Sequence, residues 1–339
     1  MPVTIARQSA EPSLAELRDR RIQRGTIRDR GRRLSLALVN NMPDSALFAT
    51  QRQFIRLVEE GARDFDVTLG LTTLETVARS EELKREMAEL YRFPAALSAK
   101  AADAVLVTGA EPRAATLEQE PYWRELTNLF DMARARTFST LASCLAAHAL
   151  ALHLDGVARR RFARKWSGLY WTQMATPNAL TEGLPEGWAP HSRWNGLDEA
   201  ELTAAGYVVL TRSAEAGVDM FARDDGHLSL SFQSHPEYES DTLAREYRRD
   251  LLRAIQGYAK PPEPPANFYA PDVEARLRAH VDGMLAGNEA PNLPSEAMIG
   301  PDASWRQRGA VVIGNWLSEI AQRKRAASGP TFLRARFGG

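Results

Sequence analysis

Residues 137–154 read TFSTLASCLAAHALALHL, in which a β-prone run ends at Cys144 and an apolar helical run follows. A cysteine at such a strand-to-helix turn gains two physical advantages. The helix N-terminus carries a partial positive charge that favours a thiolate, and the free N–H groups of the first turn can hydrogen-bond an oxyanion. A buried, inert cysteine fits the same position, so Cys144 is a candidate nucleophile that needs a second signal.

Short β-prone runs alternate with helix-like stretches around this segment. Such alternation predicts an α/β fold with a mostly parallel sheet flanked by helices. Three later runs follow one another closely, which indicates an antiparallel extension of the sheet. We expect strands at 34–39, 66–72, 104–109, 137–143, 207–213, 218–223 and 228–234, and helices at 45–61, 80–98, 122–135, 145–154, 242–258, 272–286 and 308–323.

Composition divides the chain into three parts. Residues 1–32 are polar and Arg-rich and predict an N-terminal arm. Residues 33–260 carry the alternating pattern and predict the main domain. The Pro-rich run KPPEPPANFYAP (260–271) predicts a loop or linker. Residues 261–339 are expected to form a helical extension that packs on the main domain.

The bulk properties exclude several classes of function. The formal net charge is zero, so no global field favours nucleic acid or an anionic membrane as a partner. The single cysteine cannot form an intramolecular disulfide. No apolar run reaches the about 18 residues of a membrane span, and the first residues lack a signal-peptide core. We therefore expect a cytoplasmic protein.

The common cofactor and metal motifs are absent from the sequence. No G-x-G-x-x-G follows a strand, and G-x-x-x-x-G-K-[ST], H-E-x-x-H, C-x-x-C and G-x-S-x-G do not occur. One cysteine and six scattered histidines do not support a structural zinc site. We expect no metal and no bound cofactor.

The second signal is the run SFQSHPEY (231–238), in which His235 ends a strand-like segment and Glu237 follows after a proline. Pro236 breaks the strand pattern, so the two side chains are expected to share a turn. A carboxylate beside an imidazole orients the ring and stabilises its cation. A surface His–Pro turn is the alternative, but together with Cys144 the run predicts a Cys–His–Glu constellation.

With these residues the chain resembles the homoserine O-acyltransferases of methionine biosynthesis, which include succinyl- and acetyltransferases. The resemblance implies a class I glutamine-amidotransferase-like fold, a flavodoxin-like three-layer sandwich. It covers most of the chain beyond residue 32. The segments that carry it are LVNNMPDSALFATQRQFIRLV (38–58), VLVTGA (105–110), PYW (121–123), STLASC (139–144), KWSGLY (165–170), APHSRW (189–194), HPEY (235–238), TLAREYRRD (242–250) and ASWRQRGAVVIGNWL (303–317).

The resemblance implies a ping-pong acyl transfer from succinyl-CoA, or acetyl-CoA, to the hydroxyl of L-homoserine. Acyl-CoA would be a co-substrate rather than a bound cofactor. Cys144 would accept the acyl group, His235 would act as general base, and Glu237 would support His235. Backbone N–H groups of Leu145 and Gly109 would hold the oxyanion. Leu145 departs from the family pattern, which commonly has tryptophan after the cysteine.

The resemblance also implies a set of substrate-binding residues. Lys165 and Ser192 match positions at the substrate site, and Arg249 matches the arginine expected to hold the amino-acid carboxylate. Glu246 lies three residues before Arg249 on the same predicted helix. Arg113 aligns with the acyl-chain determinant, where succinyl users tend to have glycine and acetyl users glutamate.

Three alternatives remain at this stage. The same triad could serve a glutaminase-type amidotransferase, the acceptor could be serine or another hydroxy amino acid, or the protein could be an inactive binding homologue. The changed loop at 111–120 leaves the acceptor and the donor open. The expected partners are small-molecule substrates, and relatives of this kind are typically homodimers.

Overall fold

The strands form one ten-stranded sheet in the computed structural model, which describes residues 3–5, 32–91, 102–110, 112–288 and 292–328. The strand order is β1-β3-β2-β4-β5-β10-β9-β8-β6-β7. The strands are β1 (Val3–Ile5), β2 (Arg33–Val39), β3 (Asp66–Thr72), β4 (Ala104–Val107), β5 (Ser139–Ser143), β6 (Arg160–Met174), β7 (Gly187–Gly196), β8 (Val208–Ser213), β9 (Gly217–Asp224) and β10 (Leu228–Phe232).

The sheet has a parallel part and an antiparallel part. Every pair from β1 to β10 in the strand order is parallel, and every pair from β10 to β7 is antiparallel. Strands β4 and β5 are buried at every position, as expected for parallel strands covered by helices on both faces. The predicted α/β class and the antiparallel extension are both confirmed.

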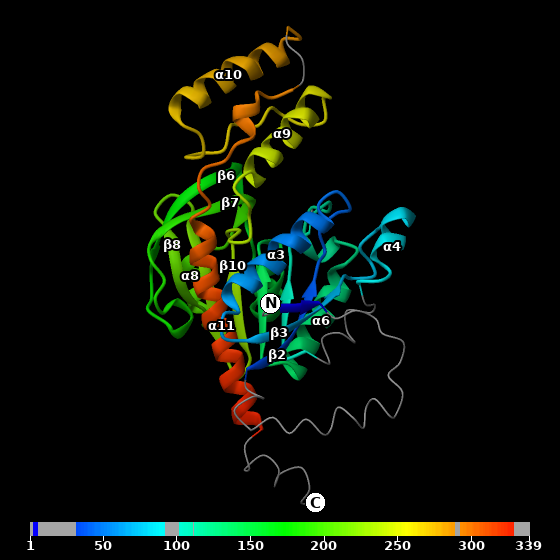
Figure 1. Cartoon of the computed structure of the whole chain (residues 1–339), viewed down its shortest axis with the longest axis vertical. Coiled ribbons are helices and arrows are strands. Elements are labelled where there is room, and N and C mark those ends of the chain that lie inside the picture. Colours follow the sequence, from blue (N-terminus) through cyan, green and yellow to red (C-terminus); the bar gives the residue numbers. More distant parts are fainter. Residues whose placement is uncertain (1–2, 6–31, 92–101, 111, 289–291, 329–339) are drawn as a thin grey trace, which may run out of the picture.

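Two apolar cores lie on opposite faces of the sheet. One core packs α3 and α11 against one face, and the other packs α6 and α7 against the opposite face, so the fold has three layers (Figure 1). The helices are α3 (Leu47–Gly61), α4 (Glu81–Met87), α6 (Trp123–Arg136), α7 (Leu145–Asp155), α8 (Glu199–Ala204), α9 (Thr242–Ile255), α10 (Pro271–Leu285) and α11 (Trp305–Ala327), with short 3₁₀ turns at Leu117–Gln119, Ala179–Thr181 and Ser295–Met298.

The last helix holds the centre of the sheet in place. Trp316 on α11 is fully buried, and its Nε1 donates a hydrogen bond of 2.7 Å to the hydroxyl of Ser139 on β5. That hydroxyl donates in turn to the Leu228 carbonyl of β10, at 2.6 Å. Because a buried indole N–H needs a partner, this chain of bonds fixes α11 against the junction of β5 and β10.

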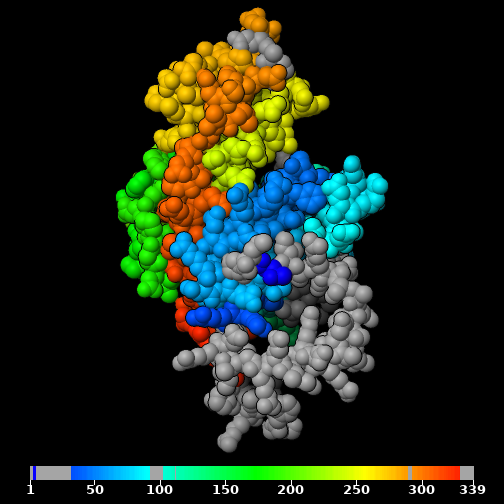
Figure 2. Space-filling view, viewed as in Figure 1, coloured from blue at the N-terminus to red at the C-terminus, as the bar shows by residue number. Residues whose placement is uncertain are grey.

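A smaller lobe stands at one end of the sheet. Helices α9 and α10 form it, with the turn at Ser295–Met298, and Figure 2 shows it in yellow and orange beyond the sheet. Its own apolar core contains Tyr247, Leu251, Leu277, Val281, Met284 and Ala297. The lobe keeps α9 beside the β6–β7 hairpin (Figure 1), which matters for the site described below.

Several sequence predictions differ from the structure. The helix expected at 80–98 ends at Met87 and continues as a turn, and its last residues, 92–98, lie outside the described residues. The long β6–β7 hairpin and α8 were not predicted. β6 begins in the run ARRRFARK (158–165), whose closely spaced charges give no clear period-two pattern, and its register shifts between Arg161 and Trp166.

The predicted N-terminal arm lies mostly outside the described residues. Within 1–32, the structure describes Val3–Ile5, which pair in parallel with β3, and Arg32. The boundaries proposed at 33–260 and 261–339 stay a prediction. In the described part of the chain, no helix combines the length and the apolar character that crossing a membrane requires.

Gly168 joins β6 to the Pro-rich linker. Its φ is 144°, and the linker residue Ala266 donates to Ser167 O at 2.9 Å and accepts from Leu169 N at 2.8 Å. A Cβ at Gly168 would overlap the backbone of Ala266 and lie 2.5 Å from its nitrogen. Only glycine therefore allows the linker to pair with β6 beside Lys165.

Gly168→Ala is expected to lower the free energy of unfolding by about 3 kcal/mol, because the new methyl group overlaps backbone that cannot retreat. Gly156→Ala is the matched control: φ is 70° there, and no heavy atom lies within 4 Å of a Cβ. The control should lose only about 1 kcal/mol, the strain of a left-handed residue. Urea unfolding measures both, and equal losses would contradict the close approach.

Candidate active site

Cys144 occupies a strained turn between β5 and α7. Its φ is 52° and its ψ is −111°, a conformation that L-residues rarely adopt and that costs about 1–3 kcal/mol. The Cys144 N–H donates to the Phe232 carbonyl of β10 at 2.7 Å. As the first residue of α7, Leu145 has a backbone N–H with no intrahelical acceptor. The turn therefore presents the thiol beside the positive end of a helix.

His235 follows the end of β10, the strand next to β5. The backbone N–H of His235 donates to the Pro190 carbonyl of β7 at 2.8 Å. The Nδ1 atom of its ring lies 2.8 Å from Glu237 Oε1. The Tyr238 ring stacks on the imidazole with centroids 4.3 Å apart. The Cys144 side chain lies close enough to the imidazole for its charge to raise the pKa of His235. The structure thus brings Cys144, His235 and Glu237 together, with the last two in one turn as expected.

The charges around His235 favour its protonated form. Burial alone would lower the pKa of His235, but the Glu237 carboxylate and the Cys144 thiolate, by charge and hydrogen bond, raise it well above its usual value. Glu237 is itself buried, with 3% of its surface exposed. The arrangement therefore favours a cationic imidazole beside the Cys144 side chain.

A second polar cluster lies beside this triad, centred on Glu246 of α9. Glu246 accepts hydrogen bonds from the hydroxyls of Ser192 on β7 and, at 2.9 Å, of Tyr238. Lys165 of β6 lies 3.7 Å from the same carboxylate. Burial would raise the pKa of Glu246, but the charges of Lys165 and Arg249 and the Ser192 hydrogen bond lower it below its usual value. Glu246 is therefore ionised at neutral pH.

Asp250 links the two cations of this cluster. It accepts from Lys165 Nζ at 2.8 Å, and its other oxygen accepts from Arg249 Nε at 2.9 Å. The Lys165 side chain is 17% exposed, whereas that of Arg249 is 44% exposed and lies at the rim. The structure thus brings the four predicted substrate-site residues, Lys165, Ser192, Arg249 and Glu246, into one cluster.

Sequence reasoning gave no role to Tyr238 and did not single out Asp250. Tyr238 joins the two halves of the site, because its ring stacks on His235 and its hydroxyl binds Glu246. Asp250 follows Arg249 directly, and its spacing of four from Glu246 could have placed both carboxylates on one helix face. The position of Tyr238 had no such signal, since it follows a turn.

The remaining predicted residues lie on the other side of Cys144. A Cβ at Gly109 would lie 3.5 Å from the Leu145 nitrogen, so the two predicted oxyanion-hole residues are neighbours. Arg113 is exposed, and its backbone N–H donates to the buried Glu120 carboxylate at 2.6 Å. Glu120 also accepts from Ala114 N at 2.7 Å, which fixes the start of this loop.

A buried polar network supports the turn at Cys144 and was not predicted. His148, one turn into α7, lies 2.9 Å from Gln233 Oε1, and burial lowers the pKa of His148 to about 3. Arg193 of β7 is buried against the same network and donates to the Asn195 carbonyl at 2.9 Å. Burial lowers the pKa of Arg193, and the nearby charges of Cys144 and Asp219 offset part of that shift.

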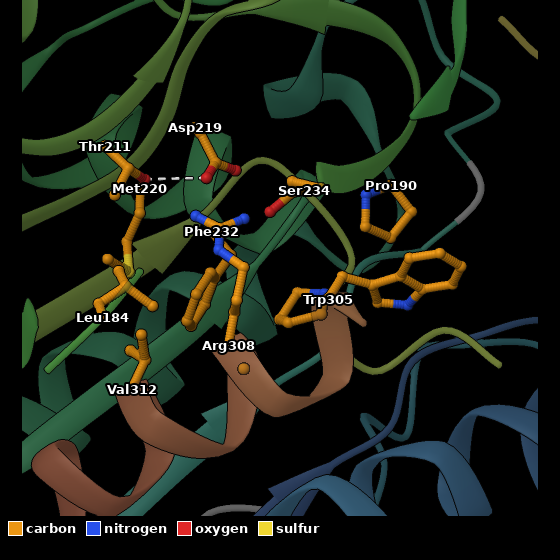
Figure 3. Close-up of a pocket in the computed structure, with 13 residues that line it drawn as sticks. Leu184, Pro190, Thr211, Asp219, Met220, Phe232, Ser234, Trp305, Arg308 and Val312 are labelled. Atoms are coloured by element: carbon orange, nitrogen blue, oxygen red, sulfur yellow. Dashed lines mark hydrogen bonds between the residues drawn. The ribbon is translucent and has the colours of Figure 1, made fainter. Parts of the chain in front are cut away.

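A small cavity lies behind the His235 turn rather than at Cys144. Figure 3 shows it between β8, β9 and α11, with Arg308 reaching into it and the Thr211 hydroxyl bonded to Asp219 at 2.8 Å. Its volume is about 30 Å³, room for one water molecule. Asp219 Oδ1 and His191 Nε2 lie 3.8 Å apart and have no hydrogen-bond partner among the described residues. The cavity is too small for a substrate.

The described residues contain no grouping of three His, Cys, Asp or Glu side chains arranged like metal ligands. The polar groups of the site instead form two connected sets. One set holds a thiol, an imidazole and the backbone N–H groups of a helix N-terminus, and the other holds charged groups of both signs. Such a site can form a covalent intermediate and can bind a small zwitterion beside it.

The chain is similar to several known proteins. The profile of the homoserine O-succinyltransferase family matches residues 15–326. A homoserine O-succinyltransferase of Methylorubrum extorquens is 43% identical over 86% of this chain and 88% of its own length. One of Rhodopseudomonas palustris is 42% identical over 85% of this chain and 88% of its own length. A solved glutamine amidotransferase of Methylobacillus flagellatus is 14% identical, with a TM-score of 0.48 over 85% of this chain and 95% of its own.

Replacement of Glu237 should turn the raised pKa of His235 into a lowered one. In Glu237→Gln the carboxylate is lost while burial remains, so the pKa of His235 should fall, as NMR titration of the ring nitrogens would show. The pKa of His235 is higher in the folded state than in the unfolded state, where it is about 6.5. The His235–Glu237 pair therefore stabilises the wild type fully below about pH 6.5, and this stabilisation is lost as the pH rises through the folded-state pKa. Glu239→Gln is the control, since Glu239 pairs with Arg56 at 2.8 Å. An unchanged titration in Glu237→Gln would contradict the assignment.

Proposed function

The chain belongs to the homoserine O-succinyltransferase family and is an acyltransferase, and from that premise we propose that it succinylates L-homoserine through an acyl-cysteine at Cys144. The observation that supports this most directly is the proximity of Cys144 to an imidazole that Glu237 keeps cationic. A thiolate attacks a thioester readily, and exchange between two thioesters keeps the acyl group activated.

The first half-reaction loads the enzyme. The Cys144 sulfur bonds to the thioester carbonyl carbon of succinyl-CoA, and the carbon–sulfur bond to CoA then breaks. The imidazolium of His235 gives its proton to the departing CoA sulfur. The oxyanion formed between these events would accept hydrogen bonds from the N–H groups of Leu145 and Gly109, which lie side by side.

The second half-reaction uses the neutral imidazole left behind. His235 takes the proton of the homoserine hydroxyl, whose oxygen bonds to the acyl carbon. The bond from that carbon to the Cys144 sulfur breaks, which releases O-succinylhomoserine and restores the thiolate and imidazolium. Because His235 gives a proton in one step and takes one in the next, its surroundings must set its pKa so that both transfers occur. Glu237 and the stacked Tyr238 ring provide that environment.

The cluster around Glu246 suits the amino-acid acceptor. Homoserine is a zwitterion, so its ammonium group needs an ionised carboxylate and its carboxylate needs a cation. Glu246 is ionised and partly buried, and the more exposed Arg249 donates to Asp250. We assign the ammonium to Glu246 and the carboxylate to Arg249. CoA thioesters are cytoplasmic metabolites, so we place the reaction in the cytoplasm.

Mass spectrometry tests the covalent step. Wild-type protein mixed with succinyl-CoA alone and quenched in acid should gain the mass of one succinyl group on the peptide that contains Cys144. The Cys144→Ala variant should gain none and should release CoA at less than about one-thousandth of the wild-type rate, as expected for loss of a nucleophile. A wild-type protein without adduct, together with an active Cys144→Ala, would exclude the acyl-cysteine route.

Steady-state kinetics test the acceptor site. Arg249→Met should raise the KM for homoserine by about 10- to 100-fold, the loss of one charged hydrogen-bonding pair. The KM for succinyl-CoA should stay within about threefold, since the donor does not contact this cation. Arg248→Met, an exposed neighbour on α9, is the matched control. A parallel rise in both KM values for Arg249→Met would reject the assigned contact.

A further inference from the structure

The start of α11 packs against the turn at 235–238, which carries His235 and Glu237. Trp305 of α11 and Pro236 of the turn both line the small cavity behind this turn. Figure 3 shows Trp305 where the helix begins. A segment far along the chain therefore lies directly behind the two residues to which the proposed reaction assigns proton transfer.

Side chains of α11 hold the backbone of this turn. Trp305 Nε1 donates to the Tyr238 carbonyl at 2.9 Å, and the Arg306 guanidinium donates to the Glu237 carbonyl at 3.3 Å. Trp305 is 2% exposed and packs in one apolar cluster with Tyr238. Buried carbonyl groups outside helices and strands need donors from elsewhere in the fold. Two consecutive carbonyls of the turn thus receive a donor from the same helix.

Gly309 allows α11 to approach the turn closely. A Cβ at this position would lie 2.8 Å from Pro236 Cβ and 2.9 Å from Leu57 Cδ1, so at least one of these groups would have to move. The pyrrolidine ring of Pro236 is tied to its own backbone and cannot swing aside as a longer side chain can. The glycine therefore sets how near the helix lies to the residue between His235 and Glu237.

The Glu237 carboxylate depends on its backbone for its position. Its Oε1 lies 2.8 Å from His235 Nδ1, whereas its Oε2 is buried and has no hydrogen-bond partner among the described residues. A carboxylate held by several N–H groups would keep its place if the backbone moved slightly. Here a small displacement of the turn acts directly on the bond to His235, because hydrogen bonds weaken steeply with poor geometry.

We propose that Trp305, Arg306 and Gly309 are positioning residues, which hold the turn at 235–238 so that Glu237 stays hydrogen-bonded to His235. The last helix is then part of the machinery that orients the base, in addition to covering the sheet. The expected effect on the rate rests on the proposed function. The expected effect on the titration of His235 does not, since it can be measured without substrates.

Two glycines of α11 give a matched pair of variants. Gly309→Ala presses a methyl group against Pro236, whereas Gly314→Ala places one 3.1 Å from the Gly61 carbonyl oxygen of α3. Both crowd the helix, but only Gly309→Ala should displace the turn. A weaker bond to the carboxylate leaves burial to act on the imidazole. NMR titration should therefore show a lower pKa of His235 in Gly309→Ala and a wild-type titration in Gly314→Ala.

Rates of CoA release from succinyl-CoA with homoserine extend this comparison to the reaction. Gly309→Ala should lower kcat by about 10- to 100-fold, the effect of misplacing a reacting group by a fraction of an ångström to one ångström. Gly314→Ala should stay within about threefold of the wild type. Urea unfolding of both variants ensures that the rates are compared where each protein is folded.

Trp305→Phe covers the case in which Gly309→Ala does not fold. It removes the donor to the Tyr238 carbonyl without changing the charge, and it should lower the pKa of His235 and reduce kcat by about 3- to 10-fold. Asn315→Ala is its control on the same helix, since the Asn315 amide donates to the Leu180 carbonyl at 3.1 Å. The control should titrate as the wild type does.

Arg306→Met tests the third contact. Arg306 also pairs with Glu60 at 2.7 Å, so Glu60→Gln is the control, which removes that charge and leaves the donor to the Glu237 carbonyl in place. Arg306→Met should lower kcat by about 3- to 10-fold, and Glu60→Gln should stay within about twofold. Because Arg306→Met also removes a charge, the rate rather than the titration is its readout.

A wild-type titration of His235 in folded Gly309→Ala or folded Trp305→Phe would overturn the proposal. Equal changes in these variants and their controls would also overturn it, since they would reflect crowding or lost stability alone. A wild type that releases no CoA would overturn the proposed function, and the titration of His235 would still decide whether α11 positions the turn.

Discussion

The parallel pairing of β5 with β10 is the constraint on which the site depends. The register places Ser143 opposite Phe232, and the Cys144 N–H then donates to the Phe232 carbonyl at 2.7 Å. Because parallel strands end at the same edge of a sheet, the thiol and the imidazole emerge together although they are far apart in sequence. Trp316 secures this pair of strands from the opposite end through Ser139 and the Leu228 carbonyl. A shift of register by one residue would turn both side chains away from each other.

The two parts of the sheet contribute different parts of the site. The parallel part ends in Cys144 and His235, at the carboxyl edge where α/β sheets commonly bind ligands. The antiparallel hairpin β6–β7 contributes Lys165 and Ser192, and α9 brings Glu246 and Asp250 against them. Tyr238 couples the two parts, since it stacks on His235 and binds Glu246. The cluster around Glu246 therefore lies next to His235.

The sequence predicted the reactive centre better than its surroundings, because the patterns that mark the reactive centre lie within a few residues of one another. Cys144 at a strand-to-helix turn and Glu237 two residues after His235 are local patterns, so period and turn chemistry could identify them. The proximity of Cys144 and His235 is non-local, so the sequence predicted it only by combining two separate local patterns, and the resemblance supported the combination. The start of the β6–β7 hairpin was hidden in an Arg-rich run, where surface charges and inward-facing charges look alike. Tyr238 depends on a stacking geometry that no spacing encodes.

The charge state of the site depends on one carboxylate, as a comparison of two buried histidines shows. His148 and His235 both lie near Cys144, and burial opposes protonation of each. His148 faces the amide of Gln233, which cannot compensate for lost hydration, and its pKa falls to about 3. His235 faces Glu237 and the thiolate, and its pKa rises well above the usual value. Equal burial with opposite outcomes means that the neighbouring group decides the proton position. With a pKa of about 3, His148 does not take up a proton at neutral pH, whereas His235 does.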